Sequence, residues 1–410
     1  MEPEDRLELI EQHGNIALSM IFNDISKIAE EKFIDNVKNE IKTILTIQLQ
    51  HLYNHDIEND ITEIIKEIFD IIHNTYIPKR SYLSTFIIKK LDYNTREKIK
   101  QQILYLRNVP QPEQRTSEWY EMRHNLITAS NAWKAFHTQS SINQLIYEKC
   151  EPINTEKFAS VNVDSPFHWG QKYEPVSVMF YEEKYNTKIE DFGCIPDINN
   201  KFLGVSPDGI NVKYDSDLYG RMLEIKNPIS RIINGIPKRE YWIQMQLQMS
   251  VCGLNECDFL ETSFKEYNSY DEFINDGNFN KTKDGKQKGI MLNFLRDQKP
   301  IYEYAPLNIS ESEYKIWEAK KMKQHMDDTW IKNIYYYLHE YSCVLVLQNM
   351  SWFNYAKNIL SDLWNIVLKE RVTGYEHRAP KKRIKTIKKC KENDDEDITL
   401  TNCMINLENI

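Results

Sequence analysis

The sequence predicts an α/β fold in which a mixed central sheet is flanked by helices, with an added N-terminal helical domain. Two patterns support this prediction. In the first 109 residues, apolar residues recur at the spacing of amphipathic helices. From about residue 115 onward, short apolar runs typical of strands alternate with longer helical stretches, and aromatic residues become frequent.

Residues 1–109 are expected to form a helical accessory domain. One helix face is defined by isoleucines with charged residues between them, namely Ile61, Ile64, Ile65, Ile68 and Ile72. Asn59-Asp60 can cap this helix, and Pro78 lies just beyond its end. The stretch 108–112, which contains two prolines, is typical of a linker. Nothing in this region carries recognisable chemistry, which favours a supporting or partner-binding role.

Residues 113–370 are expected to form the main α/β domain, with helices at its C-terminal end. Its earlier helices are expected near 117–125, 141–149, 169–185 and 238–252. Its strands are expected around 188–196, 201–206, 220–226, 257–262 and 288–295. Aromatic and aliphatic residues are dense in 310–370, and we expect helices throughout that stretch.

Residues 371–410 are expected to be a charged, disordered tail. Eight of the fourteen residues from Arg378 to Lys391 are lysine or arginine, and an acidic run follows at 392–397. Blocks of like charge with few large apolar residues do not bury enough surface to fold. Such a tail is typical of a solvated segment with nonspecific affinity for nucleic acid, or of a nuclear-localisation-like segment.

The composition is that of a globular chain. It has 410 residues, 41% hydrophobic and 28% charged, and no apolar run long enough to cross a bilayer, so no membrane association is expected. The acidic N-terminus lacks the layout of a secretory signal, and the seven scattered cysteines predict an intracellular, reducing compartment. A net charge of −9 argues against a positive coat, but a local basic groove can still bind nucleic acid.

Two short motifs carry the strongest chemical signal. Ser206-Pro207-Asp208-Gly209 places an aspartate at a turn, and Glu224-Ile225-Lys226 follows it. Because side chains alternate along a strand, Glu224 and Lys226 face one way and Ile225 faces the other. Asp208 and Glu224 can then share a hard cation such as Mg²⁺, which prefers carboxylate and carbonyl oxygens. Lys226 can orient an attacking water or stabilise developing phosphate charge, so the pattern suits metal-dependent phosphodiester hydrolysis.

Two further segments add charged groups to this predicted site. The segment Trp169-Gly170-Gln171-Lys172-Tyr173-Glu174 opens a helix and places Glu174 where it can supply a third carboxylate. In the segment that follows Arg115, Arg123 and Ser130 provide a guanidinium and a hydroxyl group. Together these two groups suit a terminal phosphate.

Amides and a strand-ending dipeptide complete the pattern. The predicted helix at 241–248 carries Gln244 and Gln248 on one face, with Gln246 between them. Asn227-Pro228 ends the predicted strand directly after Lys226.

Taken in order, these motifs resemble the lambda-exonuclease-like, YqaJ-type viral recombinase nucleases of the PD-(D/E)xK superfamily, especially those of large double-stranded DNA viruses. The resemblance covers roughly residues 113–300 and implies the restriction-endonuclease-like core of that superfamily. Singly the motifs are weak or moderate, but five of them in this order make a specific signature. Relatives often have Cys-Pro where this chain has Asn227-Pro228, a change that we do not expect to disturb metal binding.

The resemblance implies the metal site and its catalytic lysine. Asp208 and Glu224 correspond to the direct metal ligands, and the backbone carbonyl of Ile225 completes the set. Glu174 corresponds to the helix carboxylate that supports the water shell of the metal. Lys226 corresponds to the catalytic lysine.

The resemblance also implies residues that contact DNA and water. Gln244 corresponds to the glutamine near the nucleophilic water. Arg123 and Ser130 match the positions that hold a 5′-phosphate. Gln246 occupies the next motif position and is grouped with the DNA-binding residues.

The activity implied is Mg²⁺-dependent exonucleolytic digestion of double-stranded DNA ends in the 5′→3′ direction, with Mn²⁺ able to substitute. The product strand would pass to a single-strand annealing protein during viral recombination, repair or genome processing. The implied location is the host cytoplasm, at viral replication sites, or the nucleus. Toroidal trimers occur among relatives, and the N-terminal extension leaves open whether this chain forms a homo-oligomer.

Three alternatives stay open at this point. The first is a DNA endonuclease of the same superfamily, against which the predicted Arg123/Ser130 phosphate pocket argues. The second is an iron–sulfur relative, for which Cys252 and Cys257 are too few and too widely spaced. The third is a catalytically silent DNA-binding protein, which the intact Asp208, Glu224 and Lys226 oppose.

Overall fold

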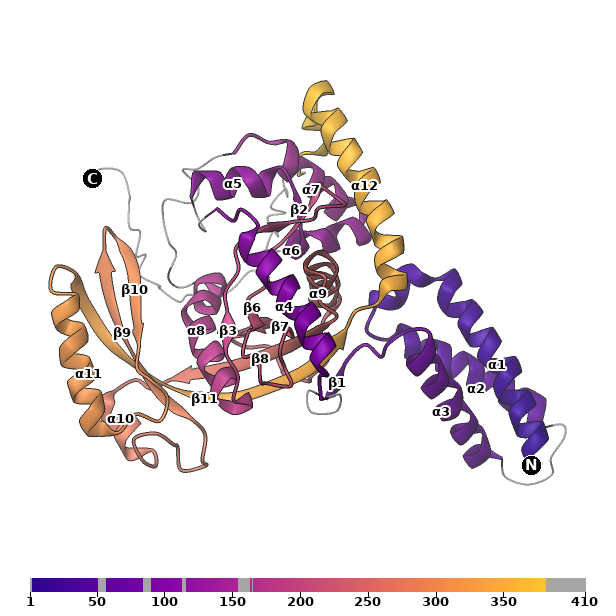
Figure 1. Cartoon of the computed structure of the whole chain (residues 1–410), viewed down its shortest axis with the longest axis horizontal. Helices are drawn as coiled ribbons and strands as arrows, with labels where there is room; N and C mark the ends of the chain where they lie inside the picture. Colours follow the sequence, from indigo (N-terminus) through magenta and orange to yellow (C-terminus); the bar gives the residue numbers. More distant parts are fainter. Residues whose placement is uncertain are drawn as a thin grey trace, which may run out of the picture.

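The computed structural model describes residues 2–50, 57–83, 90–112, 116–153, 163 and 165–380. A central sheet has helices on both faces, and a bundle of N-terminal helices extends to one side of it (Figure 1). The predicted α/β class, a mixed sheet flanked by helices, is therefore confirmed. The predicted tail lies outside the described residues from position 381 onward. No helix in the described part of the chain combines the length and the apolar character that a membrane span requires.

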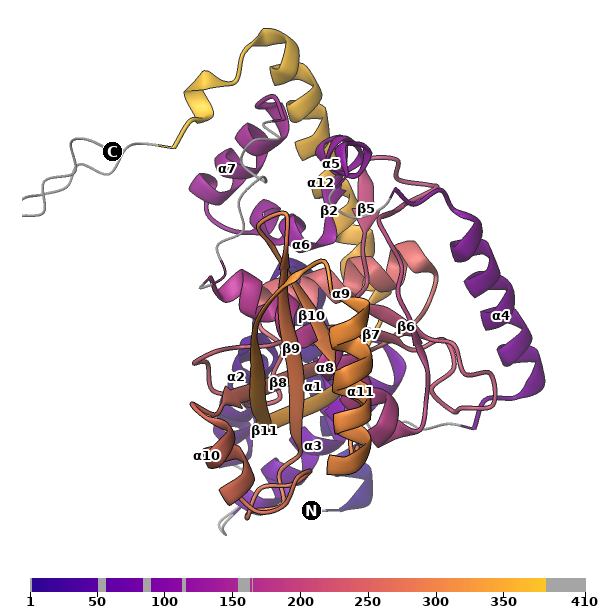
Figure 2. The ribbon, with the colours of Figure 1, turned by 90° about the vertical axis from the view of Figure 1, so that its left-hand side faces the viewer.

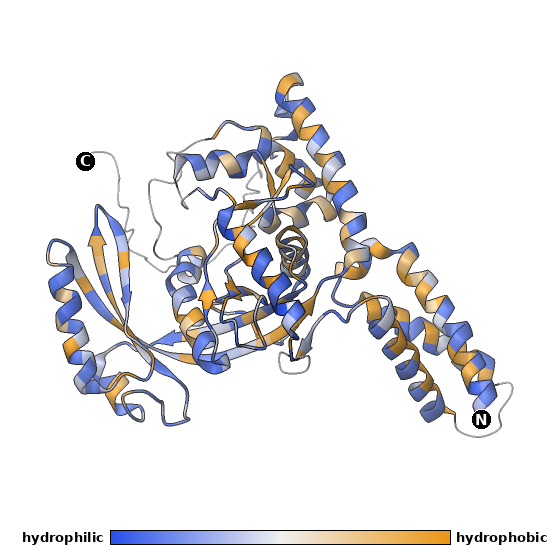
Figure 3. Cartoon of the chain, in the orientation of Figure 1, coloured by the Kyte–Doolittle hydropathy of each residue, from blue (hydrophilic) through white to orange (hydrophobic). Residues whose placement is uncertain are grey.

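The N-terminal bundle consists of α1 (Pro3–Asn23), the short η1 (Ile25–Ala29), α2 (Phe33–Gln50) and α3 (Glu58–Thr75). The isoleucine face predicted for α3 is confirmed, because four of its five isoleucines are buried in the core and Ile65 packs against it. Apolar and hydrophilic residues alternate along all three helices of the bundle (Figure 3).

The last helix of the N-terminal region lies apart from this bundle. Helix α4 (Tyr93–Asn108) packs against the α/β part, where the Gln102 amide donates to the carbonyl of Cys252 at 2.8 Å. Asp92 caps α4, because its side chain accepts a hydrogen bond from the backbone of Thr95. Residues 1–109 thus occupy two places in the molecule, and the domain boundary at residue 109 stays a prediction.

The main sheet is mixed. Its strand order is β10-β9-β11-β8-β7-β6-β3, and β1 pairs with β11. Strands β7 and β8 are parallel, and all other neighbouring strands of this sheet are antiparallel. These strands are β1 (Tyr82–Leu83), β3 (Ile189–Glu190), β6 (Gly209–Asn211), β7 (Met222–Lys226), β8 (Glu256–Glu266), β9 (Lys288–Arg296), β10 (Lys299–Tyr304) and β11 (Thr329–Leu347).

Helices α8 (Pro166–Tyr185) and α9 (Arg239–Cys252) cover opposite faces of the strands around β7. On one face, Tyr181 of α8 packs with Ile225 of β7. On the other face, Ile243 of α9 belongs to a cluster that includes Phe259 of β8. Because side chains alternate along a strand, Glu224 and Lys226 lie on the face covered by α9.

A small second sheet adjoins the main one and leads into the predicted site. Its order is β2 (Ile127–Thr128), β5 (Leu203–Val205) and β4 (Ile195–Pro196). The helices α5 (Ser117–His124), α6 (Ala129–Ala132) and α7 (Gln139–Cys150), with the short η2 (Trp133–Phe136), surround it. Strand β5 ends directly before Ser206-Pro207-Asp208.

The expectation of helices throughout 310–370 is wrong. Helices α11 (Glu311–Gln324) and α12 (Met350–Thr373) enclose β11, a strand of 19 residues. The sequence of β11 is rich in tyrosine, isoleucine and valine, which favour strands because they fit a pleated, half-buried surface. Its first half pairs with β9 and its second half with β8, so it joins the central sheet to an outlying arm.

The arm contains β9, β10, α11 and the short helix α10 (Tyr270–Asn275). It extends away from the core on the left of Figure 1 and faces the viewer in Figure 2. It has its own apolar cluster, in which Phe273 and Tyr314 pack with Ile290. Its hairpin turn uses Asp297 and Gln298, both with positive φ, as the tight two-residue connection requires.

Candidate active site

The predicted acidic residues meet where β6 and β7 pair. Gly209 lies opposite Leu223 in this antiparallel pair, so Asp208, one position earlier, lies beside Glu224. The backbone N–H of Ile225 donates to Asp208 Oδ2 at 2.6 Å and fixes the aspartate at the strand end. The structure therefore brings Asp208, Glu224 and the Ile225 backbone together, as the sequence predicts.

Lys226 lies beside both carboxylates. Its ammonium forms an ion pair with Glu224 and lies 5.1 Å from the centre of the Tyr241 ring. Burial lowers the pKa of Lys226, but the charges of Glu224 and Asp208 outweigh burial and hold that pKa above its usual value. Lys226 is accordingly a cation at neutral pH.

The electrostatics of Asp208 favour occupation of the site by a cation. Burial and the neighbouring carboxylate of Glu224 raise the pKa of Asp208 well above its usual value, against the opposing effect of Lys226. Glu174 raises this pKa as well, which shows that its carboxylate lies close enough to act on the pair. A divalent cation bound here would relieve the mutual repulsion of these groups.

The donor set fits a hard cation that keeps several waters. Asp208 and Glu224 offer carboxylate oxygens, and Ile225 offers a backbone carbonyl. Within the described residues, no group of three or more His, Cys, Asp or Glu side chains is arranged to hold a metal. Carboxylate and carbonyl oxygens are the ligands that hard divalent cations prefer.

Gln248 links the two predicted metal ligands, Asp208 and Glu224, through the elements that carry them. Its amide donates to Glu224 Oε2 at 2.8 Å and to the carbonyl of Ser206 at 3.2 Å. It therefore connects the catalytic strand β7 with the turn that carries Asp208. The sequence placed Gln248 on the same helix face as Gln244 but gave no sign of its contact with Glu224.

The other two glutamines of α9 differ from each other. Gln244 lies one helical turn before Gln248 and is half-buried on the same face. Gln246 is fully buried; it donates to the carbonyl of Leu347 at 3.0 Å and accepts from the backbone of Asn349 at 2.6 Å. This geometry contradicts the predicted DNA contact of Gln246, because its amide is engaged inside the protein on a different face of the helix.

Arg123 lines a cavity of about 220 Å³ next to the acidic site. Its guanidinium lies 3.4 Å from the Ser206 hydroxyl, as a long hydrogen bond, and 4.5 Å from the centre of the Trp119 ring. Ser130 is exposed nearby, and its hydroxyl lies 3.4 Å from that of Thr128, which lines the cavity. The predicted phosphate-binding residues thus lie beside the turn that carries Asp208.

Lys149 of α7 is a further cation of this cavity that the sequence did not reveal. It is buried, and its ammonium donates to the carbonyl of Arg123 at 2.6 Å. Burial, together with the charges of Arg123 and Arg371, lowers the pKa of Lys149 to about 7. Glu148 and Glu151 line the same cavity, so its wall carries both signs of charge.

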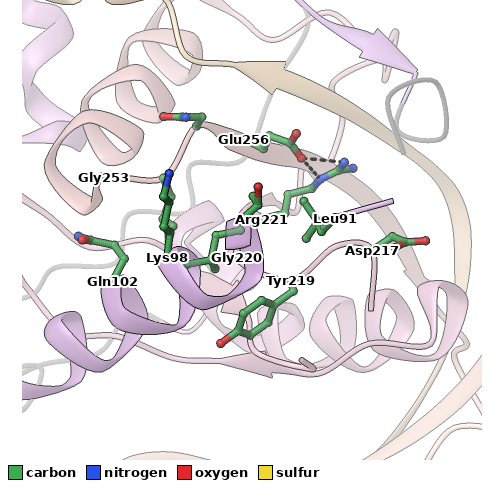
Figure 4. Close-up of a pocket in the computed structure, with 13 residues that line it drawn as sticks. Leu91, Lys98, Gln102, Asp217, Tyr219, Gly220, Arg221, Gly253 and Glu256 are labelled. Atoms are coloured by element: carbon green, nitrogen blue, oxygen red, sulfur yellow. Dashed lines mark hydrogen bonds and ion pairs between the residues drawn. The ribbon is translucent and has the colours of Figure 1, made fainter. Parts of the chain in front are cut away.

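A second cavity, of about 390 Å³, lies apart from the acidic site, between α4 and the segment 217–221 (Figure 4). Arg221 at its wall is buried and forms ion pairs with Glu256 at 2.8 Å and Asp258 at 3.2 Å. The protein therefore neutralises the charge of Arg221, and Lys98 of α4 is a second cationic residue that lines this cavity.

Comparisons with known proteins agree with the motifs. Residues 118–255 match the sequence profile described as the YqaJ-like viral recombinase domain, within the stretch that carries the predicted resemblance. The chain is 28% identical over 372 residues to "Uncharacterized protein R354" of Acanthamoeba polyphaga mimivirus, an alignment that covers 80% of this chain and 63% of that protein. The chain therefore spans less than two thirds of the length of this relative.

Two solved structures also show similarity. They are an alkaline exonuclease (LHK-Exo) from Laribacter hongkongensis and the same protein in complex with dAMP. Each is 17% identical, and each alignment covers 62% of this chain and 94% of the other chain. The TM-scores are 0.37 and 0.36.

Proposed function

We propose that the chain, whose residues 118–255 match the profile of the YqaJ-like viral recombinase domain, is a metal-dependent deoxyribonuclease that digests duplex DNA from its ends. One observation carries the proposal. The metal-binding pair Asp208 and Glu224, the cation Lys226 and the Arg123 cavity lie around one turn, Ser206-Pro207-Asp208. Phosphodiester hydrolysis at a DNA terminus needs these groups close together.

Each residue has a defined task in this reaction. Asp208, Glu224 and the Ile225 carbonyl would hold Mg²⁺, with Mn²⁺ able to substitute, and Glu174 would bind its water. The bound cation would lower the pKa of a water molecule and offset phosphate charge. Lys226, which lies beside these carboxylates, would orient the attacking water or stabilise charge on the phosphate.

The Arg123 cavity supports a direction for digestion. A guanidinium discriminates a phosphate dianion from a neutral hydroxyl group, because charge-assisted hydrogen bonds are about twice as strong as neutral ones. Each cut regenerates a 5′-phosphate, which Arg123 and Ser130 can hold for the next step. We therefore propose 5′→3′ digestion that leaves a single strand for an annealing protein, in viral recombination or repair in the host cytoplasm or nucleus.

The test is digestion of a linear duplex labelled at either end, with or without a 5′-phosphate, in Mg²⁺ or in EDTA. We expect metal-dependent release of label from the 5′ end first, and faster digestion of the phosphorylated duplex. Arg123→Ala should remove most of the preference for a 5′-phosphate. Arg107→Ala is the matched control, since Arg107 of α4 forms a partly exposed ion pair with Glu190 of β3.

Three outcomes would overturn parts of the proposal. Cleavage in EDTA at the full rate would exclude the metal mechanism. Rapid cutting of covalently closed circular DNA would replace the exonuclease by an endonuclease. DNA binding without metal-dependent turnover would leave a silent DNA-binding protein.

A further inference from the structure

Asn227, the residue after Lys226, binds two elements across the end of β7. Its amide nitrogen donates to the carbonyl of Gly170 in α8 at 3.0 Å. Its carbonyl oxygen accepts from the hydroxyls of Ser177 in α8, at 2.7 Å, and Thr262 in β8, at 2.5 Å. The orientation of the amide follows from these partners, because a backbone carbonyl such as that of Gly170 can only accept.

The two contacts on α8 lie on either side of Pro175, where the helix lacks one backbone hydrogen bond. Pro175 is inside α8 and has no N–H, so the helical hydrogen bond to the carbonyl of Gln171 is missing there. Gly170 precedes the proline and Ser177 follows it. Asn227 therefore contacts α8 on both sides of Pro175. Glu174 is the residue directly before this proline.

Glu174 lies in the part of α8 that Asn227 contacts, between Gly170 and Ser177. Helix α8 covers the face of β7 opposite to Glu224 and Lys226. Asn227 follows directly after Lys226, so one short segment at the end of β7 both carries Lys226 and holds α8 on either side of Glu174. Another bond, from the Tyr304 hydroxyl to the carbonyl of Lys172 at 2.8 Å, holds the same part of α8 from the arm.

We propose that Asn227 is a positioning residue that sets α8, and with it Glu174, at the correct place relative to the metal-binding pair. The inference rests on the proposed function in so far as the pair binds a divalent cation. The task suits an amide, whose nitrogen donates to Gly170 while its oxygen accepts from both hydroxyls.

The test is a double-mutant cycle of Asn227→Leu and Glu174→Gln, read out as Mg²⁺ affinity by titration calorimetry and, in parallel, as kcat and KM on duplex DNA. Leucine matches asparagine closely in size but makes no hydrogen bond. If Asn227 acts through Glu174, Asn227→Leu weakens Mg²⁺ binding about tenfold in the wild-type background. The same substitution causes little further loss once Glu174 is glutamine, because the group that it positions is gone.

A matched control separates positioning from general destabilisation. Asn211 is a buried asparagine that likewise forms hydrogen bonds with three partners, among them the carbonyl of Arg221 at 2.7 Å. Its contact with α8 is at Tyr181, two helical turns beyond Glu174. Asn211→Leu should lower the melting temperature without changing Mg²⁺ affinity. Should Asn227→Leu fail to fold, the milder Asn227→Ser, whose side chain is too short to span Gly170 and Thr262, enters the same cycle.

The outcomes separate this inference from the proposed function. Additive losses in Mg²⁺ affinity would overturn the positioning role of Asn227, even if wild type digests DNA. Non-additive losses without DNA hydrolysis would uphold it while the nuclease function fails. A wild-type protein that binds no Mg²⁺ would overturn both.

Discussion

Two buried glutamines of α9, two positions apart, allow a sharp test of the metal site. Gln248 donates to the carboxylate of Glu224 and to the carbonyl of Ser206, whereas Gln246 bonds only to the backbone of Leu347 and Asn349. Leucine preserves the approximate size of either side chain and removes its hydrogen bonds. We expect Gln248→Leu to weaken metal binding and cleavage, and Gln246→Leu to lower stability alone.

The magnitude follows from the contacts that are lost. A hydrogen bond to a charged group such as Glu224 contributes about 1.5–3 kcal/mol, and one between neutral groups about 0.5–1.5 kcal/mol. Loss of a residue that supports a metal ligand lowers affinity about 10–100-fold. That range equals about 1.4–2.7 kcal/mol at 25 °C, consistent with the single bond from Gln248 to Glu224. Gln246→Leu removes two neutral bonds and should destabilise the fold by about 1–3 kcal/mol.

Calorimetric titration with Mg²⁺ and denaturant unfolding, applied to both variants, give the two quantities independently. The expected pattern is a loss of Mg²⁺ affinity in Gln248→Leu and wild-type affinity in Gln246→Leu, with a lower free energy of unfolding in both. Equal Mg²⁺ affinities in the two variants would refute the argument that the contact with Glu224 supports the metal ligand.

Three further predictions concern charge. Lys226→Ala should retain DNA binding but lose cleavage by orders of magnitude. Lys226→Arg should not restore cleavage, because a planar guanidinium cannot replace the point charge of the ammonium. Single-turnover rates at saturating DNA measure both effects. Arg221→Met should destabilise the fold by about 3–5 kcal/mol in denaturant unfolding, since it removes the cation that neutralises the buried carboxylate of Asp258, whereas Arg107→Met at the partly exposed pair with Glu190 should cost about 1 kcal/mol or less. Because the pKa of Asp208 is raised on folding, its contribution to stability is present at low pH and lost as pH rises through the folded pKa. Metal-free stability should therefore fall with rising pH above about 4, a trend that Asp208→Asn and added Mg²⁺ should each reduce in thermal unfolding measured across pH.

The parts of the site that the sequence predicted are those set by local rules. Asp208 begins a turn, and Glu224 and Lys226 share a face because strands have a period of two residues. Helix periodicity also placed α8 and α9 correctly to within a few residues.

The parts that the sequence missed depend on packing between distant segments. Periodicity puts Gln246 and Gln248 on different faces of α9, but only the packing of α9 on β7 decides which of them reaches Glu224. Lys149 joins the Arg123 cavity through the packing of α7 and has no motif of its own. The apolar content of the β11 sequence is compatible with either a helix or a strand. Its pairing with both β8 and β9 stabilises the strand, and that pairing depends on segments far apart in the sequence.

The late position of β11 in the sequence affects how the sheet folds during synthesis. It supplies the neighbour of β8 on the side opposite β7, and its residue Leu345 pairs with Tyr82 near the start of the chain. Until residues up to Leu347 have left the ribosome, one edge of β8 has no neighbouring strand along its length, and β1 has no partner. Nascent chains shorter than this present a template for pairing with other strands, so completion of the sheet is a late event and chaperone protection matters most before it.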